Sequence, residues 1–512
     1  MKHQTLIRAF ATTAVMLTIT FTAQAQLGGM LKKAKEAVEK EVEKVVEDKT
    51  VDTKQQSAGV LPDNVKDVAL PGKTQGATVV GIPRGTKDIY VSATGSNRNT
   101  GGKSDPYKDI QKAVDEAPEG AVIHVTEGNY LGKLNAGYIE IKKYLSLVGG
   151  YSSDFSRRDP SKFHTTIQPP ADAGGTNANK GLLDIYVRGK RDGLILVDGF
   201  TLDKGMQNKY VSVDTKNPKF MAPEGCETGM LNPPGMQISQ PSMRGVTTVG
   251  NQLIHGDVEG NVVIRDCVFL NGSHYAIQMG NLGGHFDIYN NIFLASRMAA
   301  CEVRGMNKEV GESTISFHHN TVLFTWRRDW VPANKDMGYG FRFMTRMDAE
   351  VYNNIIGCSD FSGIDRTYID SDLSKEKQRK TSAYNNLFFG NIEADLTLPS
   401  GGGKFMRIFS DMFEDVDQLV KAHGNREMND AEIETFSMAV DAAYLKAFLN
   451  MEGSSVSTYN PNSSENIFRS ALGMNTRGVE SNYVSMYANA YPRAKAYDLF
   501  GAIPNYGAQV IK

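Results

Sequence analysis

Short apolar segments, each introduced by an Asn or Asp, recur along the middle of the chain. The introducing residues are Asp266, Asn291, Asn320, Asn354 and Asn386, so successive segments lie 25, 29, 34 and 32 residues apart. This period is about the length expected for one coil of a β-helix with its loops. A single coil cannot bury its apolar residues, whereas stacked coils form one continuous core. The pattern therefore predicts an all-β solenoid, a parallel β-helix over residues 88–400.

The repeated Asn suits the turn between two strands for two reasons. It adopts the left-handed αL conformation more readily than most residues, and its side-chain amide can join a ladder of hydrogen bonds along the stack. We therefore interpret these residues as structural and expect any chemistry to lie elsewhere in each coil.

The start of the predicted solenoid has a distinctive order of elements. Apolar residues 89–91 are followed by a polar turn, a helical pattern over residues 105–114 and a second apolar run over residues 121–125. This order resembles the entry segment of the pectate-lyase-like superfamily, in which a short helix closes the first coil. The resemblance implies a right-handed parallel β-helix over residues 88–400.

The resemblance carries over no catalytic residue. Proteins of this superfamily include lyases, glycosidases, epimerases and adhesins without enzymatic activity, so the fold does not select a reaction. The chain lacks the adjacent Asp-Asp pair of the pectin-hydrolysing glycosidases and the Trp-x-Asp-His strand of pectate lyases. It also lacks the HExxH, Walker, GxSxG and Cys/His zinc patterns.

Both ends of the chain differ in pattern from the solenoid. Residues 1–25 combine Lys2 and Arg8 with an apolar stretch over residues 9–21 and a small-x-small cleavage site, which predicts a signal peptide. Residues 26–50 predict an amphipathic helix, residues 51–87 a linker, and residues 401–512 a C-terminal cap region with helices. No later run reaches the roughly 18 apolar residues that a membrane helix needs. We therefore expect an exported protein, periplasmic or extracellular, without a transmembrane segment.

Charge and cysteine content narrow the function further. The chain has 56 basic and 58 acidic residues, so it lacks the positive field that binds a phosphate backbone, and nucleic acid is not an expected partner. Its cysteines, Cys226, Cys267, Cys301 and Cys358, match neither a small disulfide scaffold nor a zinc motif. We interpret them as mostly buried small side chains. The sequence does not determine the oligomeric state.

Strand alternation predicts a polar column on the outside of the solenoid. Side chains of a strand point alternately inward and outward, and equivalent strands of successive coils lie about 4.8 Å apart. With the Asn residues as register, the same outward position is occupied by Gln278, Glu302, Arg342 and Asp365, with Arg304 and Arg366 nearby. We expect this column to be exposed and to form a groove suited to a linear polymer.

Such a column has the groups that acidic polysaccharide chemistry requires. In β-elimination from a uronic acid, the carboxylate must be neutralised and a base must remove the C5 proton. Arg342 suits either task, while Glu302 and Asp365 are candidates to bind Ca²⁺ or to orient Arg342. In a glycoside hydrolase, Glu302 and Asp365 would instead be the catalytic carboxylate pair. The structural alternative is a ladder of surface charges that joins adjacent coils.

A second candidate binding feature contains both tryptophans of the chain. An insertion before the strand at residue 339 carries Trp326, Arg327, Arg328 and Trp330. Exposed Trp stacks on sugar rings and Arg pairs with carboxylate or sulfate, so this insertion resembles a glycan-binding wall. The alternative is a loop that folds back and buries its own tryptophans. The lysine-containing segment 205–243 is the other candidate wall.

These observations favour a secreted polysaccharide lyase that acts on an acidic polysaccharide, with Ca²⁺ as the candidate cofactor. Two alternatives stay open. One is a glycoside hydrolase on the same groove, and the other is a non-catalytic glycan-binding or surface β-helix protein.

Overall fold

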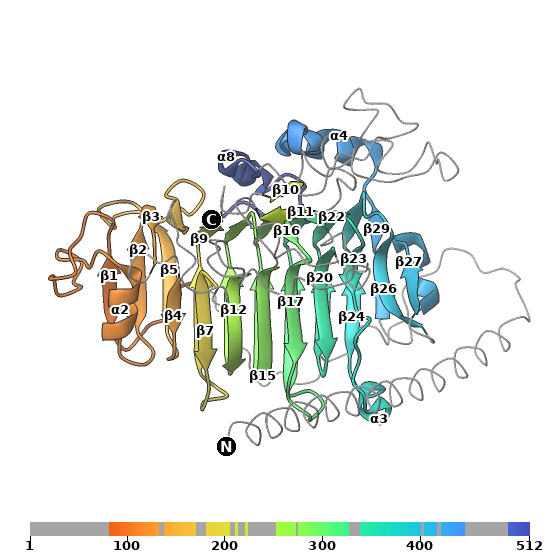
Figure 1. Ribbon diagram of the computed structural model, residues 1–512, viewed down its shortest axis with the longest axis horizontal. Helices are drawn as coiled ribbons and strands as arrows, with labels where there is room; N and C mark the ends of the chain where they lie inside the picture. Colours follow the sequence, from red (N-terminus) through yellow and green to blue (C-terminus); the bar gives the residue numbers. More distant parts are fainter. Residues whose placement is uncertain are drawn as a thin grey trace, which may run out of the picture.

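The computed structural model describes residues 81–132, 138–169, 181–204, 210–212, 221–223, 252–272, 275–326, 338–400, 404–416, 421–445 and 490–511. The expected signal peptide (1–25), the amphipathic helix (26–50) and most of the linker (51–80) lie outside the described residues. The described chain winds into a right-handed parallel β-helix, with coils stacked side by side along its long axis (Figure 1), as the sequence predicted.

Most strands belong to three parallel sheets, which the chain visits in turn in each coil. Sheet 1 consists of β1 (Asp88–Val91), β2 (Val122–Thr126), β5 (Ser146–Tyr151), β8 (Leu194–Asp198), β13 (Asn261–Arg265), the second part of β15 (Tyr275–Tyr289), β18 (Ser313–His318), β21 (Asp348–Tyr352), β24 (Thr381–Tyr384) and β28 (Lys421–His423). Sheet 2 consists of β3 (Gly128–Tyr130), β6 (Thr165–Ile167), β9 (Phe200–Asp203), β14 (Val268–Leu270), β16 (Ile292–Arg297), β19 (Thr321–Trp326), β22 (Ile355–Ser359), β25 (Leu387–Phe389) and β29 (Arg426–Glu427).

Sheet 3 consists of β4 (Ile139–Ile141), β7 (Leu183–Val187), β12 (Gln252–Glu259), the first part of β15, β17 (Ala299–Gly305), β20 (Tyr339–Thr345), β23 (Ser362–Asp365), β26 (Ala394–Ser400) and the antiparallel β27 (Lys404–Ile408). A separate antiparallel pair is formed by β10 (Tyr210–Ser212) and β11 (Met221–Pro223). The helices are α2 (Ile110–Glu116), α3 (Leu373–Glu376), α4 (Asp430–Ala439) and α8 (Arg493–Ala496), with 3₁₀ helices η7 (Ser410–Val416) and η9 (Tyr497–Leu499).

Inward-facing apolar residues stack from coil to coil and form the core. One column of sheet 1 reads Ile123, Leu147, Val197, Ile264, Ile288, Phe317, Val351 and Ala383, all buried. The rings of Phe317 and Phe341 stack with their centroids 4.1 Å apart. The described cysteines, Cys267, Cys301 and Cys358, are buried as interpreted, whereas Cys226 lies outside the described residues. Removal of this apolar surface from water stabilises the stack, because a single coil has no interior of its own.

At the turn between sheets 1 and 2, two adjacent residues share the two roles expected of the recurring Asn, which are the αL conformation and the side-chain ladder. The first residue of each pair adopts the αL conformation, with φ of 51° at His319 and 54° at Asn353. The second residue joins a buried ladder, in which Asn320 Nδ2 donates to Asn354 Oδ1 at 3.2 Å. The same amide donates to the carbonyl oxygen of Ile288 at 2.8 Å. The ladder therefore satisfies buried polar groups and fixes the start of each coil.

The first coil is covered by α2, in agreement with the resemblance seen in the sequence. Ile110 and Val114 are buried against the coil. The Gln111 side-chain amide donates to the carbonyl oxygen of Glu140 at 3.1 Å and accepts from its N–H at 2.8 Å. The helix thus pairs with backbone groups at the open end of the solenoid.

The solenoid continues beyond residue 400, where the sequence placed its end. Strand β28 pairs in parallel with β24, and β29 pairs with β25, so the parallel stack continues to Glu427. This extra partial coil carries the same turn as the earlier coils, because Asn386 Nδ2 donates to Asn425 Oδ1 at 2.9 Å.

The C-terminal part lies against the outward face of sheet 2 (Figure 1). Phe436 of α4 and Leu499 of η9 join a buried apolar cluster with residues of sheet 2. The N–H of Gly507 donates to the carbonyl oxygen of Asn353 at 2.8 Å. This face is therefore covered by the chain itself. In the part of the chain that the structure describes, no helix is both long and apolar enough to cross a membrane.

Candidate functional site on sheet 3

The residues predicted to share one outward column do occupy it. The strand register pairs Gln278 with Glu302, Glu302 with Arg342, and Arg342 with Asp365. The preceding residue of each strand, such as Ile277 on β15, lies in the core, so the column faces away from it. The predicted register is confirmed across loops of different length, because the Asn ladder restarts each coil at the same point.

The column is largely buried, so the expectation of an exposed groove was wrong. Glu302, Arg342 and Asp365 are only 2%, 3% and 0% exposed. Two phenol rings contact the Arg342 guanidinium, with the ring centroids of Tyr339 and Tyr368 at 4.6 and 4.7 Å from Cζ. Strand alternation gave the correct side of the sheet, but it carries no information about side chains that pack over that side.

Arg342 joins the two buried carboxylates. Its Nε lies 2.8 Å from Oδ2 of Asp365, and its Nη1 lies 3.3 Å from Oε2 of Glu302. Burial opposes the charge of the guanidinium, but the carboxylate of Asp365 and then that of Glu302 outweigh it and hold the pKa of Arg342 above its ordinary value. Arg342 is therefore a buried cation held between two carboxylates, and this corrects the expectation that it acts as the base or neutralises a substrate carboxylate.

The burial of Asp365 disfavours its charged form. Burial raises the pKa of Asp365, although Arg342 and hydroxyl donors oppose the shift. The Thr397 hydroxyl donates to Oδ1 at 2.7 Å, and the Thr367 hydroxyl donates to Oδ2 at 3.1 Å. Both oxygens of Asp365 are thus engaged within the protein, which makes it a partner of Arg342 and removes it as a substrate-contacting carboxylate.

Glu302 connects the buried cluster to the surface. Its Oε1 accepts hydrogen bonds from Gln278 Nε2 at 2.9 Å and from Arg304 Nη2 at 3.0 Å. The Arg304 side chain is 47% exposed, whereas that of Glu302 is 3% exposed. A buried carboxylate therefore orients an accessible guanidinium, which suits Arg304 to an anionic ligand. Arg304 and the half-buried Gln278 are the described residues of the sequence prediction that stay accessible.

Arg366 does not lie beside the column, contrary to expectation. Its guanidinium is fully buried and lies 5.0 Å from the ring centre of Phe343, a core residue. Its Nη2 donates to Oε1 of Glu376 in α3 at 2.7 Å. Arg366 follows Asp365 directly and therefore points to the opposite side of the strand. It links α3 to the solenoid and is not placed to bind a ligand.

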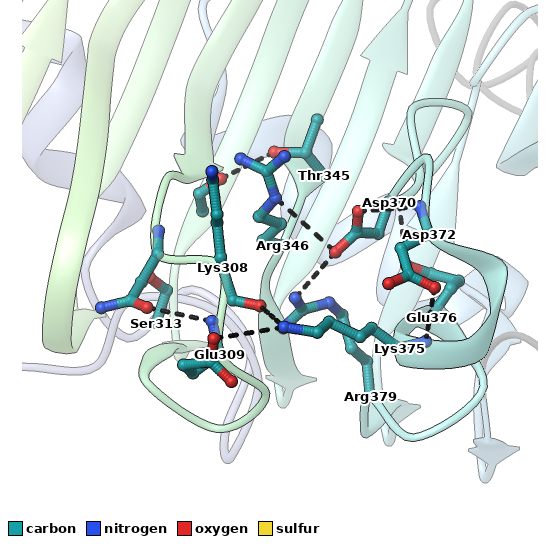
Figure 2. A network of polar contacts seen from close by, with 12 residues as sticks. Lys308, Glu309, Ser313, Thr345, Arg346, Asp370, Asp372, Lys375, Glu376 and Arg379 are labelled. Carbon is teal, nitrogen blue, oxygen red and sulfur yellow. Dashed lines mark hydrogen bonds and ion pairs between the residues drawn. The ribbon is translucent and has the colours of Figure 1, made fainter. Parts of the chain in front are cut away.

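The insertion that carries α3 is fastened to neighbouring coils, as Figure 2 shows. Oδ2 of Asp370 lies 2.9 Å from Nη2 of Arg379 and 3.7 Å from Nε of Arg346. Nζ of Lys375 reaches Oε1 of Glu309, on the turn after β17, at 3.2 Å. The side chains of Asp370 and Arg379 are almost fully buried, so this pair is screened less by water than a surface pair.

Only the first residue of the tryptophan-containing insertion can be placed. Trp326 ends β19, where its backbone pairs with Arg297 of β16. Its side chain lies outside the described residues, as do Arg327, Arg328 and Trp330. The glycan-binding wall therefore stays a prediction, and so does the second wall over residues 205–243, of which the structure describes only β10 and β11.

A polar group on the same face was missed by the sequence prediction. On β12, His255 occupies the column position before Gln278, and on β7 Asp184 occupies the position before His255. Nδ1 of His255 lies 3.3 Å from Oδ1 of Asp184 and 3.3 Å from the hydroxyl oxygen of Tyr186. A sequence signal existed, because Ile254 and His255 repeat the apolar-then-polar order of the following coil.

The geometry selects the basic nitrogen of His255. A carboxylate only accepts hydrogen bonds, so Nδ1 carries the proton in the neutral ring and Nε2 is the basic nitrogen. The His255 side chain is 25% exposed, that of Asp184 is 4% exposed, and Tyr186 is 40% exposed. We call Asp184, Tyr186, His255, Gln278 and Arg304 the sheet 3 site. It combines an oriented imidazole, a phenol, an amide and a guanidinium on one outward face.

Comparison with known proteins finds only limited similarity to this chain. A family model described as a protein of unknown function (DUF1565) matches residues 93–217, which is less than half of the chain. No curated protein matches the chain significantly.

Among solved structures, a pectin methylesterase in complex with a hexasaccharide has 13% identity and a TM-score of 0.31, covering 68% of this chain and 94% of its own. A pectate lyase has 11% identity and a TM-score of 0.32, covering 67% and 80%. A polygalacturonase from Erwinia carotovora ssp. carotovora has 10% identity and a TM-score of 0.26, covering 69% and 100%. The fold described above rests on strand pairing, and no residue is transferred from these proteins.

The carboxylates expected to bind Ca²⁺ do not fit that task. Arg342 pairs with both Glu302 and Asp365, and a bound cation would have to displace this guanidinium. Ca²⁺ takes six to eight oxygen ligands, whereas these oxygens already accept hydrogen bonds from Gln278, Arg304 and Thr397. Over the residues that the structure describes, no cluster of three His, Cys, Asp or Glu side chains is arranged to hold a metal ion.

Proposed function

We propose that this chain is an exported protein that binds an acidic polysaccharide at the sheet 3 site and cleaves it by β-elimination, with His255 as the base. The observation that carries the proposal is the accessible His255 imidazole, which Asp184 and Tyr186 hold on the outward face that also presents Arg304. Export is proposed from the signal-peptide pattern of residues 1–25.

The proposed reaction assigns one task to each accessible group. Nε2 of His255 removes the C5 proton of a uronate, and the electrons of that C–H bond form the C4–C5 double bond. The C4–O4 bond breaks, and the Tyr186 hydroxyl gives its proton to the leaving oxygen. Arg304 and Gln278 bind the substrate carboxylate, which lowers the energy of the carbanion-like transition state.

The buried cluster supports these groups without contacting substrate. Glu302 orients both Gln278 and Arg304 through its Oε1. Arg342 compensates the charge of Glu302 from the other side, at 3.3 Å from Oε2. In this proposal Glu302, Arg342 and Asp365 are positioning residues, because they act through Arg304 and Gln278.

The test is incubation of the mature protein with polygalacturonate, alginate and glycosaminoglycans, each with Ca²⁺ and with a chelator. The ultraviolet absorbance of unsaturated uronates reports elimination. We expect product from at least one of these polymers, and we expect His255→Gln to lower kcat by about 10²- to 10⁴-fold, the usual contribution of a general base. Binding of the polymer should be retained in this variant.

A matched control is His423→Gln, which removes an exposed histidine of β28 on sheet 1. This variant should keep full activity. The proposal would be abandoned if no polymer gave an unsaturated product, or if His255→Gln were as active as the wild type.

A second candidate function is non-catalytic glycan binding. It is favoured by the carboxylates of this face, since Asp184 is hydrogen-bonded to His255, and Glu302 and Asp365 both pair with Arg342. Retention of the wild type on a polymer without any unsaturated product or new reducing end would support it. A glycoside hydrolase is less favoured, because Arg342 separates the two carboxylates that would have to act on the sugar.

A further inference from the structure

Tyr368 presents an aromatic ring on the sheet 3 side of the molecule. The residue is 51% exposed, which is unusual for a large aromatic side chain. The Arg342 guanidinium lies over the ring, with Cζ 4.7 Å from the centroid. One face of the ring therefore rests on a buried cation, and the exposed half of the residue is open to a ligand.

The support under this ring is rigid. Arg342 is 3% exposed and is fixed by Asp365 on one side and Glu302 on the other. A guanidinium held in this way has lost its rotational freedom before any ligand binds. A cation in contact with a ring face also attracts the ring, by about 0.5–2 kcal/mol depending on exposure. The buried cluster thus fixes the position of Tyr368.

The backbone of Tyr368 is held as firmly as its ring. Its carbonyl oxygen accepts hydrogen bonds from the N–H of Thr345 at 2.6 Å and from Nη1 of Arg366 at 3.1 Å. Thr345 has φ of 57°, an uncommon conformation for a β-branched residue that costs about 1–3 kcal/mol. Asp370, two residues further on, is tied to Arg346 and Arg379 (Figure 2). The protein therefore maintains a strained residue where it anchors Tyr368.

We propose that Tyr368 is a stacking platform for one pyranose ring of the polysaccharide, with Glu302, Arg342 and Asp365 as its support. The flat CH face of a pyranose is apolar and matches the face of a phenol ring, while the hydroxyl groups of the sugar stay in water. A preorganised, immobile ring binds a ligand more tightly than a mobile one, because less conformational entropy is lost on binding. The inference rests on the proposed function for its ligand class.

The platform and the proposed base belong to different coils. Tyr368 follows β23, whereas His255 lies on β12, and four strand-to-strand steps separate these strands in sheet 3. At about 4.8 Å per step, strands β12 and β23 are about 19 Å apart along the axis. Only an oligosaccharide several units long reaches both residues. Among chains held at His255, Tyr368 should therefore contribute to the binding of long ones and not of short ones.

The test uses affinity electrophoresis of the full mature chain in gels that contain acidic polymers (polygalacturonate, alginate) or neutral polymers (galactan, xylan). Tyr368→Ala should bind any polymer that retards the wild type about tenfold more weakly, the loss expected for one aromatic contact of about 1.4 kcal/mol. Tyr368→Phe keeps the ring and should behave like the wild type. Met438→Ala, at an exposed residue of α4, is the control for an unrelated surface change.

The outcomes separate this inference from the proposed function. Retardation by neutral polymers alone, lost in Tyr368→Ala, would support the platform and contradict the acidic substrate. Equal retardation of Tyr368→Ala and wild type on long polymers would overturn the platform and leave the proposed function in place. Absence of retardation in every gel would contradict both.

Discussion

Nε of Arg342 lies 2.8 Å from Oδ2 of Asp365, a residue of the next coil, and both side chains are buried. Neither charge is stable in this environment without the other, because burial removes the water that would otherwise solvate it. Single substitutions in the outward column of sheet 3 should therefore lower the free energy of unfolding strongly, although this column faces away from the core.

Arg342→Ala should lower the free energy of unfolding by about 3–5 kcal/mol, since it leaves the carboxylates of Asp365 and Glu302 buried with less compensation. Chemical denaturation followed by circular dichroism measures this change. The control is Arg304→Ala, which removes an exposed partner of the same Glu302 and should cost at most about 1 kcal/mol. Equal effects of the two variants would contradict the assigned difference in burial.

Asn320→Ala should destabilise the stack by about 1–3 kcal/mol for each buried group left without a partner. The groups concerned are the carbonyl oxygen of Ile288 and the N–H of Asn291, which bond to the Asn320 side chain at 2.8 and 3.0 Å. Asn353→Gly is the control, because Gly adopts the αL conformation of that position without strain. If thermal unfolding showed a larger loss for Asn353→Gly, the division of tasks between the two turn residues would be wrong.

Stability should fall as the pH drops from about 6.5 toward about 4, because His319 resists protonation in the folded chain. Burial, and then the neighbouring His318, lower the pKa of His319 to about 4, against about 6.5 in the unfolded chain. Between these values the unfolded chain binds the extra proton, so acid favours unfolding. The contacts agree with a neutral ring, since the Asn353 amide donates to Nε2 of His319 at 3.3 Å.

His319→Asn tests this interpretation, because Asn tolerates αL and does not titrate in this range. The urea midpoint measured at several pH values should depend less on pH in the variant than in the wild type. The other titratable groups near His319 stay unchanged in the variant. They include His318, whose Nε2 lies 3.1 Å from Oδ1 of Asp287. An unaltered pH dependence would assign the effect to a different group.

Gly507→Ala should destabilise the contact between the C-terminal segment and sheet 2. A Cβ at Gly507 would lie 2.5 Å from Oγ1 of Thr321 and 2.7 Å from Cδ1 of Ile355, in addition to the strain of φ at 66°. Gly311 has a similar φ of 80° with nothing within 4 Å of an added Cβ, so Gly311→Ala measures the strain alone. The difference between their melting temperatures reports the clash, and equal values would show that the segment moves away at no cost.

Sequence reasoning found the solenoid and its register because both depend on local periodicity. Asn320 and Asn354 stand at equivalent points of successive coils, and from these anchors the outward position of Glu302 opposite Arg342 followed by counting. Arg366 was expected near this column only because it follows Asp365, although the same counting puts it on the other side of its strand. His255 was missed because a long stretch of sequence separates β9, which ends at Asp203, from β12, which begins at Gln252, so its position could not be counted from a nearby anchor.

By itself, the sequence determined the parallel stack and the side of the sheet from which each side chain leaves, since strands alternate with a period of two and every coil restarts at its turn. Only the tertiary structure decided which outward residues are accessible. Arg342 is buried because the rings of Tyr339 and Tyr368 pack on it, and Tyr368 comes from a loop held by distant charges. Such packing follows no period along the chain, so it cannot be counted from the sequence.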